Sequence, residues 1–360
     1  MPNEIKALKK RKIIPKKGVK KSNSGNKIWG VVLIVLFFGI TAGYYILFKG
    51  NTDASDGEYF YIKSTDSYNQ VLENLTYHHI VKNMESFNLV ANQLDLSTKF
   101  KAGKYKLEAG MSNIELVRKI RNGGWETTVA KLKSEMTREQ VINYLAENTE
   151  ATKEELIDAM NGPWLTENGF SNENKWCIFL PDHYHLNWAS PAKKTINRFV
   201  EEYNKYWTVN RKAQAQEEGL TSKEATILAS IVDGEAIYAD EMPIIAGLYL
   251  NRVRIGMPLG ADPTIWFVIG KGERHRLRYA DLKVPHPYNT YLNKGLPPGP
   301  IFCPDKRAID AVIKPKSHNF YYMCAKPDGS LRHAFANGLD EHNRNAVAYR
   351  KSLDKKGVVR

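Results

Sequence analysis

Hydrophobic positions along this chain form one long unbroken run near the N-terminus and many short periodic runs after it. Residues 28–48 are 21 consecutive uncharged, mostly apolar residues. At about 1.5 Å per residue, a helix of this length measures about 32 Å, enough to cross a bilayer core of about 30 Å. The run is long for the apolar region of a signal peptide, and no clear small-residue cleavage site follows it. It predicts an uncleaved transmembrane anchor, with a buried core helix as the alternative.

The formal net charge of +13 is concentrated just before this run. Residues 1–27 hold ten Lys or Arg and one Glu, a balance of +9 that leaves about +4 for the other residues. Asp53, Asp56 and Glu58 follow the run on its other side. Because Lys and Arg are retained on the cytoplasmic side of membrane helices, residues 1–27 are predicted to be a cytoplasmic tail. The remainder would lie in the periplasm or outside the cell, anchored to the plasma (inner) membrane, and no nucleic-acid partner is needed to explain the tail.

Short periodic runs after a polar linker at 49–57 predict a small α/β module at 58–125. Apolar residues alternate at 59–62 and 103–107, which is typical of strands. Helical patterns cover residues 67–75, 81–91 and 112–121, and the pattern Ser112-x-x-Glu115 is a capping box at the start of the last helix. Residues 126–217 are predicted to be mainly helical, with capping boxes at Thr137 and Thr152 and an amphipathic helix at 192–207.

The most informative helix is predicted at 221–236, where TSKEATILASIVDGEA opens with the capping box Thr221-x-x-Glu224. At about 100° per residue, Leu228, Ile231 and Glu235 lie in one row, while Asp233 projects to nearly the opposite side. Partial burial of Glu235 would raise its pKa and keep it protonated as a general acid. The alternative is a solvated carboxylate at a helix end that Gly234 weakens.

Two later stretches, NRVRIGMPLGADPT (251–264) and YNTYLNKGLPPGP (288–300), are rich in turn-forming and amide residues and predict site-building loops. Together with ASIVDGEA and the closing run HAFANGLDEHN (333–343), they resemble the MltG-type (YceG-like) endolytic murein transglycosylases. In that family the helix usually reads SIVEKE and its second acid is catalytic. The matching residue here is Glu235, whereas Asp233 and Gly260 depart from the family pattern.

The resemblance implies a lytic transglycosylase that cleaves the β-1,4 bond between MurNAc and GlcNAc and leaves 1,6-anhydro-MurNAc ends. It implies Glu235 as the catalytic acid and a LysM-like fold for the module at 58–125, where FKAGKYKL carries the match. Polar side chains of the loops would orient the sugar: Asn251, Asp262, Thr264, Asn289 and Tyr291. In FLPDHYHL (179–186), Asp182 and Tyr184 would border the glycan cleft. Each of these residues could instead fix its own loop by hydrogen bonding, and for His333 and Asn343 the two interpretations are not separable.

Cysteine and histidine usage points to neither a metal nor another cofactor. Three cysteines, Cys177, Cys303 and Cys324, allow at most one disulfide, with Cys303–Cys324 as the candidate pair. His78-His79 and His183-x-His185 lack the spacing of a known metal framework. None of the cysteines lies in a catalytic motif.

The sequence thus predicts an α+β protein with a transmembrane helix, a LysM-like module, a helical linking region at 126–217 and an α+β catalytic domain at 218–355. Its predicted partners are glycan strands and the membrane, with peptidoglycan synthases or divisome proteins as candidates. Two other functions stay open. One is a non-catalytic peptidoglycan-binding membrane protein, and the other is a muramidase in which Asp233, Glu241 or Asp262 is a second catalytic carboxylate.

Overall fold

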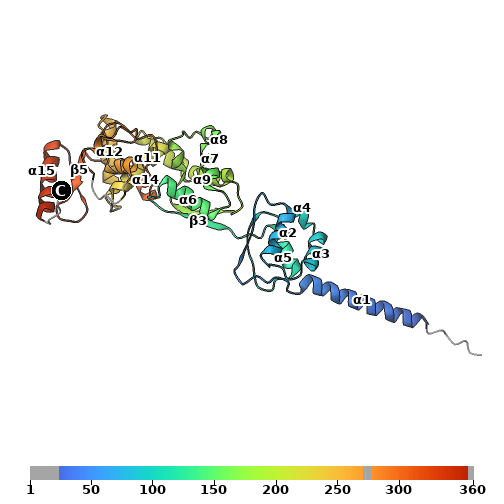
Figure 1. Cartoon of the computed structure of the whole chain (residues 1–360). Coiled ribbons are helices and arrows are strands. Elements are labelled where there is room, and N and C mark those ends of the chain that lie inside the picture. Colours follow the sequence, from blue (N-terminus) through green and yellow to red (C-terminus); the bar gives the residue numbers. More distant parts are fainter. Residues whose placement is uncertain (1–23, 271, 273–276, 356–360) are drawn as a thin grey trace, which may run out of the picture.

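The computed structural model describes residues 24–270, 272 and 277–355, and these form an elongated chain of helices and two-stranded sheets (Figure 1). Helix α1 (Ser24–Phe48) projects from one end, and its span Lys27–Phe48 is long and apolar enough to cross a membrane. Its most apolar 18-residue window is not buried in the protein, whereas Ile46 and Leu47 near its end pack against the core that follows. Most of the basic tail predicted at 1–27 lies outside the described residues.

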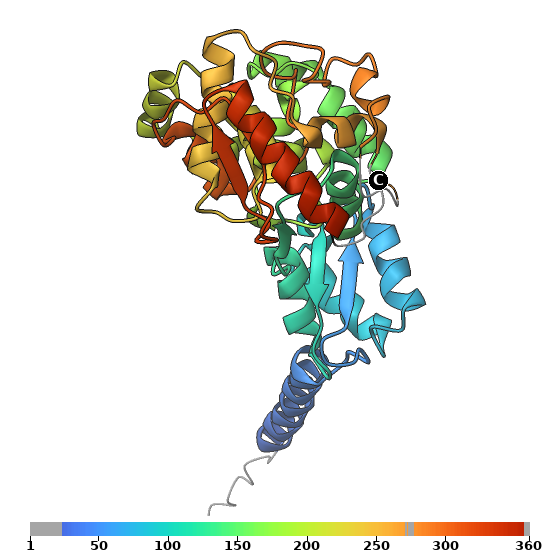
Figure 2. The ribbon, with the colours of Figure 1, turned by 90° about the vertical axis from the view of Figure 1, so that its left-hand side faces the viewer.

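Beyond α1 the chain forms an N-terminal module with its own hydrophobic core (Figure 2). Strands β1 (Tyr59–Ile62) and β2 (Gly103–Lys106) pair antiparallel, with Tyr59 opposite Lys106. The module also contains four helices: α2 (Tyr68–Tyr77), α3 (Met84–Gln93), α4 (Leu96–Lys99) and α5 (Asn113–Asn122). The core side chains alternate along the strands and recur at helical spacing, including Phe60, Ile62, Leu75, Phe87, Tyr105 and Leu116.

Capping residues set the helix starts as the sequence predicts. Ser112, Thr137, Thr152 and Thr221 each form a complete capping box, in which the side chain three residues later bonds back to the cap. The helix expected at 81–91 begins later, at Met84, because the side chain of Asn83 accepts a hydrogen bond from the backbone N–H of Ser86.

The segment 49–57 is not the free polar linker that its composition predicts. Asn51 and Thr52 are buried, and their backbone N–H groups both donate to the carbonyl of Met111. The side chain of Asn51 donates to that of Asn113 at 2.6 Å, and Asn113 in turn donates to the carbonyl of Ile46 near the end of α1. Polar residues are present here because they bind one another and the helix end, so α1 is joined directly to the module.

The region 126–217 also contains a two-stranded ribbon that the helical prediction misses. Strand β3 (Thr128–Leu132) pairs with β4 (Asp182–Leu186), so FLPDHYHL ends in a strand. The remaining elements are α6 (Arg138–Asn148), α7 (Lys153–Asn161), α8 (Pro163–Glu167), η1 (Asn174–Ile178), α9 (Ala192–Tyr206) and α10 (Val209–Glu217).

One large core joins this region to the segment after it. The core extends from Ala130 to Ile313 and includes α11 (Ser222–Glu235), α12 (Met242–Arg254) and α14 (Lys306–Ile313). Helix α13 (Asp262–Ile269) and turn η2 (Asp281–Lys283) lie beside it, and the hairpin of β5 (Tyr322–Ala325) and β6 (His333–Ala336) packs against α15 (Leu339–Lys355). The boundary expected at residue 217 therefore does not separate two hydrophobic cores.

Candidate active site

Glu235 is the last residue of α11, a helix whose middle is buried on every side. Ile231 and Leu228, one and two turns earlier on the same row, have no exposed surface. Glu235 itself is part-buried, because Ala236 leaves the helical conformation and the chain reaches the surface there. The row predicted from the sequence is therefore present, and it places the carboxylate at the edge of the core.

The protonation of Glu235 depends on its burial and on two neighbours, Asp262 and Tyr249. Burial is the largest influence, and with the nearby Asp262 carboxylate it raises the pKa of Glu235 to about 7. The hydroxyl of Tyr249 on α12 donates to Glu235 Oε1 at 3.1 Å and lowers the pKa in part. Tyr249 is buried, which raises its own pKa well above the usual value, so its hydroxyl remains a donor. Glu235 is thus poised to hold or release a proton near neutral pH.

Helix α13 approaches Glu235 closely because residue 234 is glycine. A Cβ on Gly234 would lie 2.9 Å from the Cβ of Pro263 and 3.3 Å from the ring of Phe302. The start of α13, with Asp262, can therefore lie against the end of α11. The same glycine that weakens the helix in the sequence permits this contact.

Hydrogen bonds join the two predicted loops beside the acid. Tyr291 donates through its hydroxyl to Asp262 at 2.5 Å. Buried Thr264 bonds to Thr290 through their hydroxyls at 2.9 Å, and Thr290 accepts from the backbone N–H of Ala261. Glu235, Asp262, Thr264 and Tyr291 are thus brought together, with Thr264 in a loop-fixing role.

The two asparagines among the predicted substrate-binding residues hold nearby backbone segments in place through hydrogen bonds. Asn251 donates to the carbonyls of His318 and Phe320, which holds the chain leading to β5 against α12. Asn289, with no exposed surface, donates to the carbonyls of Leu282 and Val284. In this structure both amide groups are therefore engaged in shaping the loops around Glu235.

Comparisons with known proteins show the family of this chain. The sequence matches the YceG-like family over residues 60–348. The chain belongs to the YceG-like family. A relative in Bacillus subtilis (strain 168), named endolytic murein transglycosylase, is 25% identical over 82% of this chain and 85% of its own length. A Streptococcus pneumoniae protein of the same name, from serotype 2 strain D39, is also 25% identical, over 70% of this chain, and the chain spans about half of that relative's length (51%).

A solved relative shares the fold. The crystal structure of a yceG-like protein from Listeria monocytogenes aligns with a TM-score of 0.54 and 21% sequence identity. The alignment covers 80% of this chain and 98% of that chain. The two proteins therefore share a fold over most of this chain.

Asp233 lies on the side of α11 away from Tyr249. Its carboxylate accepts a hydrogen bond from the backbone N–H of Asp305 at 2.9 Å, just before α14. It is 7% exposed, and burial raises its pKa to about 6. Asp233 is turned away from Glu235 as predicted, but it is a buried group that positions the start of α14.

Gly260 has a positive φ of 53° and lies near Arg252 and Tyr291. Its backbone N–H donates to the carbonyl of Thr290. The glycine suits this left-handed turn, which a larger residue would strain. The loop before α13 is therefore shaped by backbone contacts at this position.

Asp182 and Tyr184 lie on β4, apart from the cluster around Glu235. Asp182 forms an ion pair with Lys306 at the start of α14. Tyr184 is buried against Phe199, with ring centroids 4.4 Å apart, and its hydroxyl donates to the carbonyl of Leu180. The packing of Tyr184 leaves no face open, so its predicted place at the rim of the cleft does not agree with this structure.

Sequence reasoning missed Tyr249 and Arg252, which lie one turn apart on α12. Arg252 donates through Nε to the carbonyl of Tyr321 at 2.6 Å and through Nη1 to the carbonyl of Leu259. Its positive charge also lowers the pKa of Glu235. Tyr249 lies just before the motif NRVR and Arg252 lies within it. Their spacing of three residues along a helix was the signal that could have located them.

The remaining predicted groups have structural contacts. The backbone N–H and the ring of His333 both contact the buried carboxylate of Glu241, with the ring nitrogen Nδ1 at 3.3 Å. All three cysteines are free, so the candidate Cys303–Cys324 disulfide is not formed here. Cys303 lies in the large core and Cys324 lies on β5.

Proposed function

We propose that this chain is a membrane-anchored lytic transglycosylase that cleaves the MurNAc–GlcNAc β-1,4 bond of peptidoglycan endolytically. The observation that carries the proposal is a part-buried carboxyl group, Glu235, whose pKa is raised to about 7, within a chain of the YceG-like family. Relatives named endolytic murein transglycosylase support the substrate and the reaction. The enzyme would act on the outer side of the plasma (inner) membrane, where it would trim or terminate nascent glycan strands.

The proposed mechanism uses one acid for two proton transfers. Glu235 donates its proton to the glycosidic oxygen as the bond to C1 of MurNAc breaks. The resulting carboxylate then takes the proton of the sugar's C6 hydroxyl, whose oxygen closes onto C1 to give the 1,6-anhydro ring. Because the nucleophile belongs to the same sugar, proximity supplies much of the rate and no water is consumed. Asp262 and Tyr291 would orient the sugar beside the acid.

A hydrolase with two carboxylates is the second candidate, and Asp262 is the group that favours it. Of the three possible partners, Asp233 is bonded to Asp305 and Glu241 is bonded to His333. Asp262 is the carboxylate whose charge acts on Glu235. Its hydrogen bond from Tyr291 stabilises the carboxylate and competes with a role in activating water.

Mass spectrometry of the products from purified murein sacculi distinguishes the two. A lytic transglycosylase leaves 1,6-anhydro-MurNAc ends, 18 mass units lighter than reducing ends by the loss of one water. Reducing-end MurNAc as the main product would contradict the proposal. It would instead favour hydrolysis with Asp262 as the second catalytic carboxylate. Binding to sacculi without either product would favour a non-catalytic peptidoglycan-binding protein.

The pH dependence of the reaction should follow Glu235. The first step needs the protonated acid, so kcat/KM should be high below pH 7 and fall as the pH rises through about 7. Tyr249→Phe removes a hydrogen bond that lowers this pKa. The falling part of the kcat/KM profile should therefore move to higher pH. Tyr105→Phe removes a hydroxyl in the N-terminal module and serves as control. A limb that moves to lower pH in Tyr249→Phe would contradict the assignment.

We further propose that the N-terminal module is LysM-like and adds affinity for glycan strands. Deletion of residues 58–125 should weaken co-sedimentation with insoluble murein, while cleavage of soluble fragments continues. A variant with the surface change Lys63→Ala alone should bind as the parent does. Unchanged sedimentation of the deleted protein would make the module a spacer.

The topology is proposed from the charge distribution on either side of α1. A fluorescent protein that matures only in the cytoplasm should be dark when fused to the C-terminus, and bright when fused to the N-terminus. Fluorescence of the C-terminal fusion would reverse the orientation. Peptidoglycan synthases or divisome proteins, which act at the same surface, are the proposed protein partners.

A further inference from the structure

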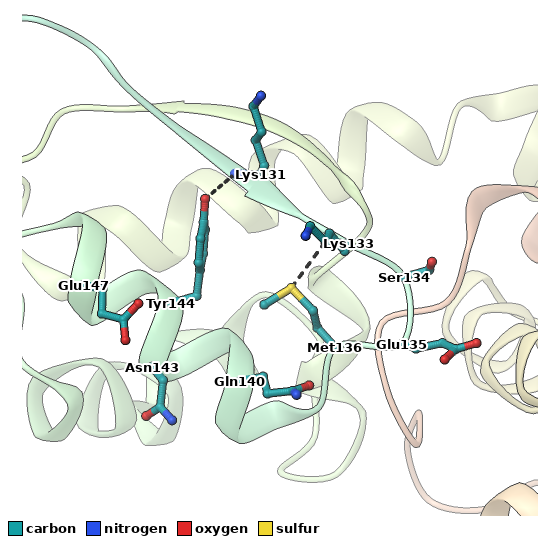
Figure 3. Close-up of a pocket in the computed structure, with 9 residues that line it drawn as sticks. All are labelled: Lys131, Lys133, Ser134, Glu135, Met136, Gln140, Asn143, Tyr144 and Glu147. Atoms are coloured by element: carbon teal, nitrogen blue, oxygen red, sulfur yellow. Dashed lines mark hydrogen bonds between the residues drawn. The ribbon is translucent and has the colours of Figure 1, made fainter.

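A cavity of about 470 Å³ opens between β3 and α6, away from the groups that surround Glu235 (Figure 3). Lys131 and Lys133 come from β3 and the turn after it, whereas Asn143, Tyr144 and Glu147 come from α6. The hydroxyl of Tyr144 accepts a hydrogen bond from the backbone N–H of Lys131 at 2.9 Å, which joins the two walls. Its volume lies within the range of about 300–1,000 Å³ that is usual for ligand sites.

Charged groups line this cavity without partners of their own. Across the part of the chain that the structure describes, Lys131 and Lys133 form no ion pair, and Glu147 has neither an ion pair nor a hydrogen bond. Most surface lysines and glutamates in proteins are simply hydrated. Here, however, residues of both charge signs line the same hollow, together with Asn143. The cavity therefore suits a ligand that carries both carboxylate and amino groups.

One end of the cavity reaches the helix that carries the acid. Glu135 lines that end, in a left-handed conformation with φ of 61°, and its backbone N–H donates to the carbonyl of Cys303. The adjacent Phe302 lies against Gly234, next to Glu235. Cys303 and Phe302 thus connect this end of the cavity to the last turn of α11, where Glu235 lies.

We infer that the cavity binds the stem peptide of the glycan strand being cleaved. The inference rests on the proposed function. Stem peptides carry free carboxylates, which match Lys131 and Lys133, and an amino group, which matches Glu147. Among the described residues that line the cavity, Tyr144 is the one aromatic side chain, so it offers little of the ring surface on which sugars stack. The peptide, and not the sugar chain, is the part of the substrate that this lining fits.

The test compares two substrates with the full-length protein in detergent. One is murein glycan with intact stem peptides, and the other is the same glycan stripped of its stems by an amidase. In the double variant Lys131→Ala with Lys133→Ala, kcat/KM for anhydro-end formation should fall about tenfold on the stem-bearing glycan, as two exposed ion pairs are lost. It should stay unchanged on the stripped glycan. Lys212→Ala, an exposed lysine on α10, is the matched control for charge.

Each outcome decides the inference. An equal fall on both substrates, or no fall on either, would overturn it. Thermal unfolding of the double variant should match that of the parent, because exposed lysines contribute little to stability. If the parent forms anhydro ends on neither substrate, the proposed function itself fails, and that result is distinct from a failure confined to the variants.

Discussion

Replacement of Glu235 by Gln should abolish the formation of anhydro ends while the fold is retained. The amide has the same shape and can still accept the hydrogen bond of Tyr249, but it can neither donate nor recover a proton. General acid–base catalysis typically contributes about 10² to 10⁴-fold, and one group that serves both steps should lose at least that much. The measurement is the rate of anhydro-muropeptide release from sacculi, together with a thermal unfolding curve.

Asp233→Asn is the matched control, since it makes the same chemical change two residues earlier on α11. The amide oxygen of this variant can still accept from the backbone N–H of Asp305, and a buried charge is removed. Its activity should therefore stay within a few-fold of the parent. If Asp233→Asn were the more damaging variant, with both proteins folded and equally stable, the assignment of the acid to Glu235 would be wrong.

Local signals in the sequence were sufficient to locate the helix that carries Glu235. The capping box at Thr221 fixes the first residue of α11, and the 100° period then fixes the direction of Glu235 relative to Leu228 and Ile231. These are contacts within one helix, so they depend only on spacing. The burial of Asp233 could not be obtained in the same way, because it depends on α14, which begins about seventy residues later.

Contacts between distant segments account for what the sequence did not predict. Strands β3 and β4 pair across some fifty residues, and the short run FLPDHYHL looks like a turn until its partner is known. The segment 49–57 looks like a linker because its polar residues are buried only by meeting Asn83 and Asn113. Polar composition predicts exposure only where such partners are absent.

The loops around the acid show the same limit. Asn251 and Asn289 were predicted to orient the sugar because they lie in the loops that resemble the YceG-like family. In the structure their amide groups bind backbone carbonyls of segments 5 to 69 residues away. The residue types were sufficient to identify these segments as site-building loops. The hydrogen-bond partner of each side chain could be known only from the fold.

Replacement of Gly299 by Ala should destabilise the larger core and separate the loop 288–300 from the region before α11. A Cβ at this position would collide with the backbone carbonyl of Glu173 and would lie 2.6 Å from the hydroxyl of Tyr288. That hydroxyl accepts a hydrogen bond from Arg138 at 2.6 Å, and Arg138 also donates to the carbonyl of Pro300. One methyl group therefore disturbs several contacts at once.

The expected cost is about 1–3 kcal/mol, as for other overpacked sites, which lowers the melting temperature by roughly 3–10 °C in a domain of this size. Gly338→Ala is the matched control, since a Cβ there would meet no atom within 4 Å. It should leave the melting temperature nearly unchanged. Because Tyr291 and Asn289 lie in the same loop as Gly299, Gly299→Ala should also lower activity at temperatures where it remains folded. A variant with the parent's melting temperature would mean that the loop can move aside freely, and Arg138 would then not be holding it in place.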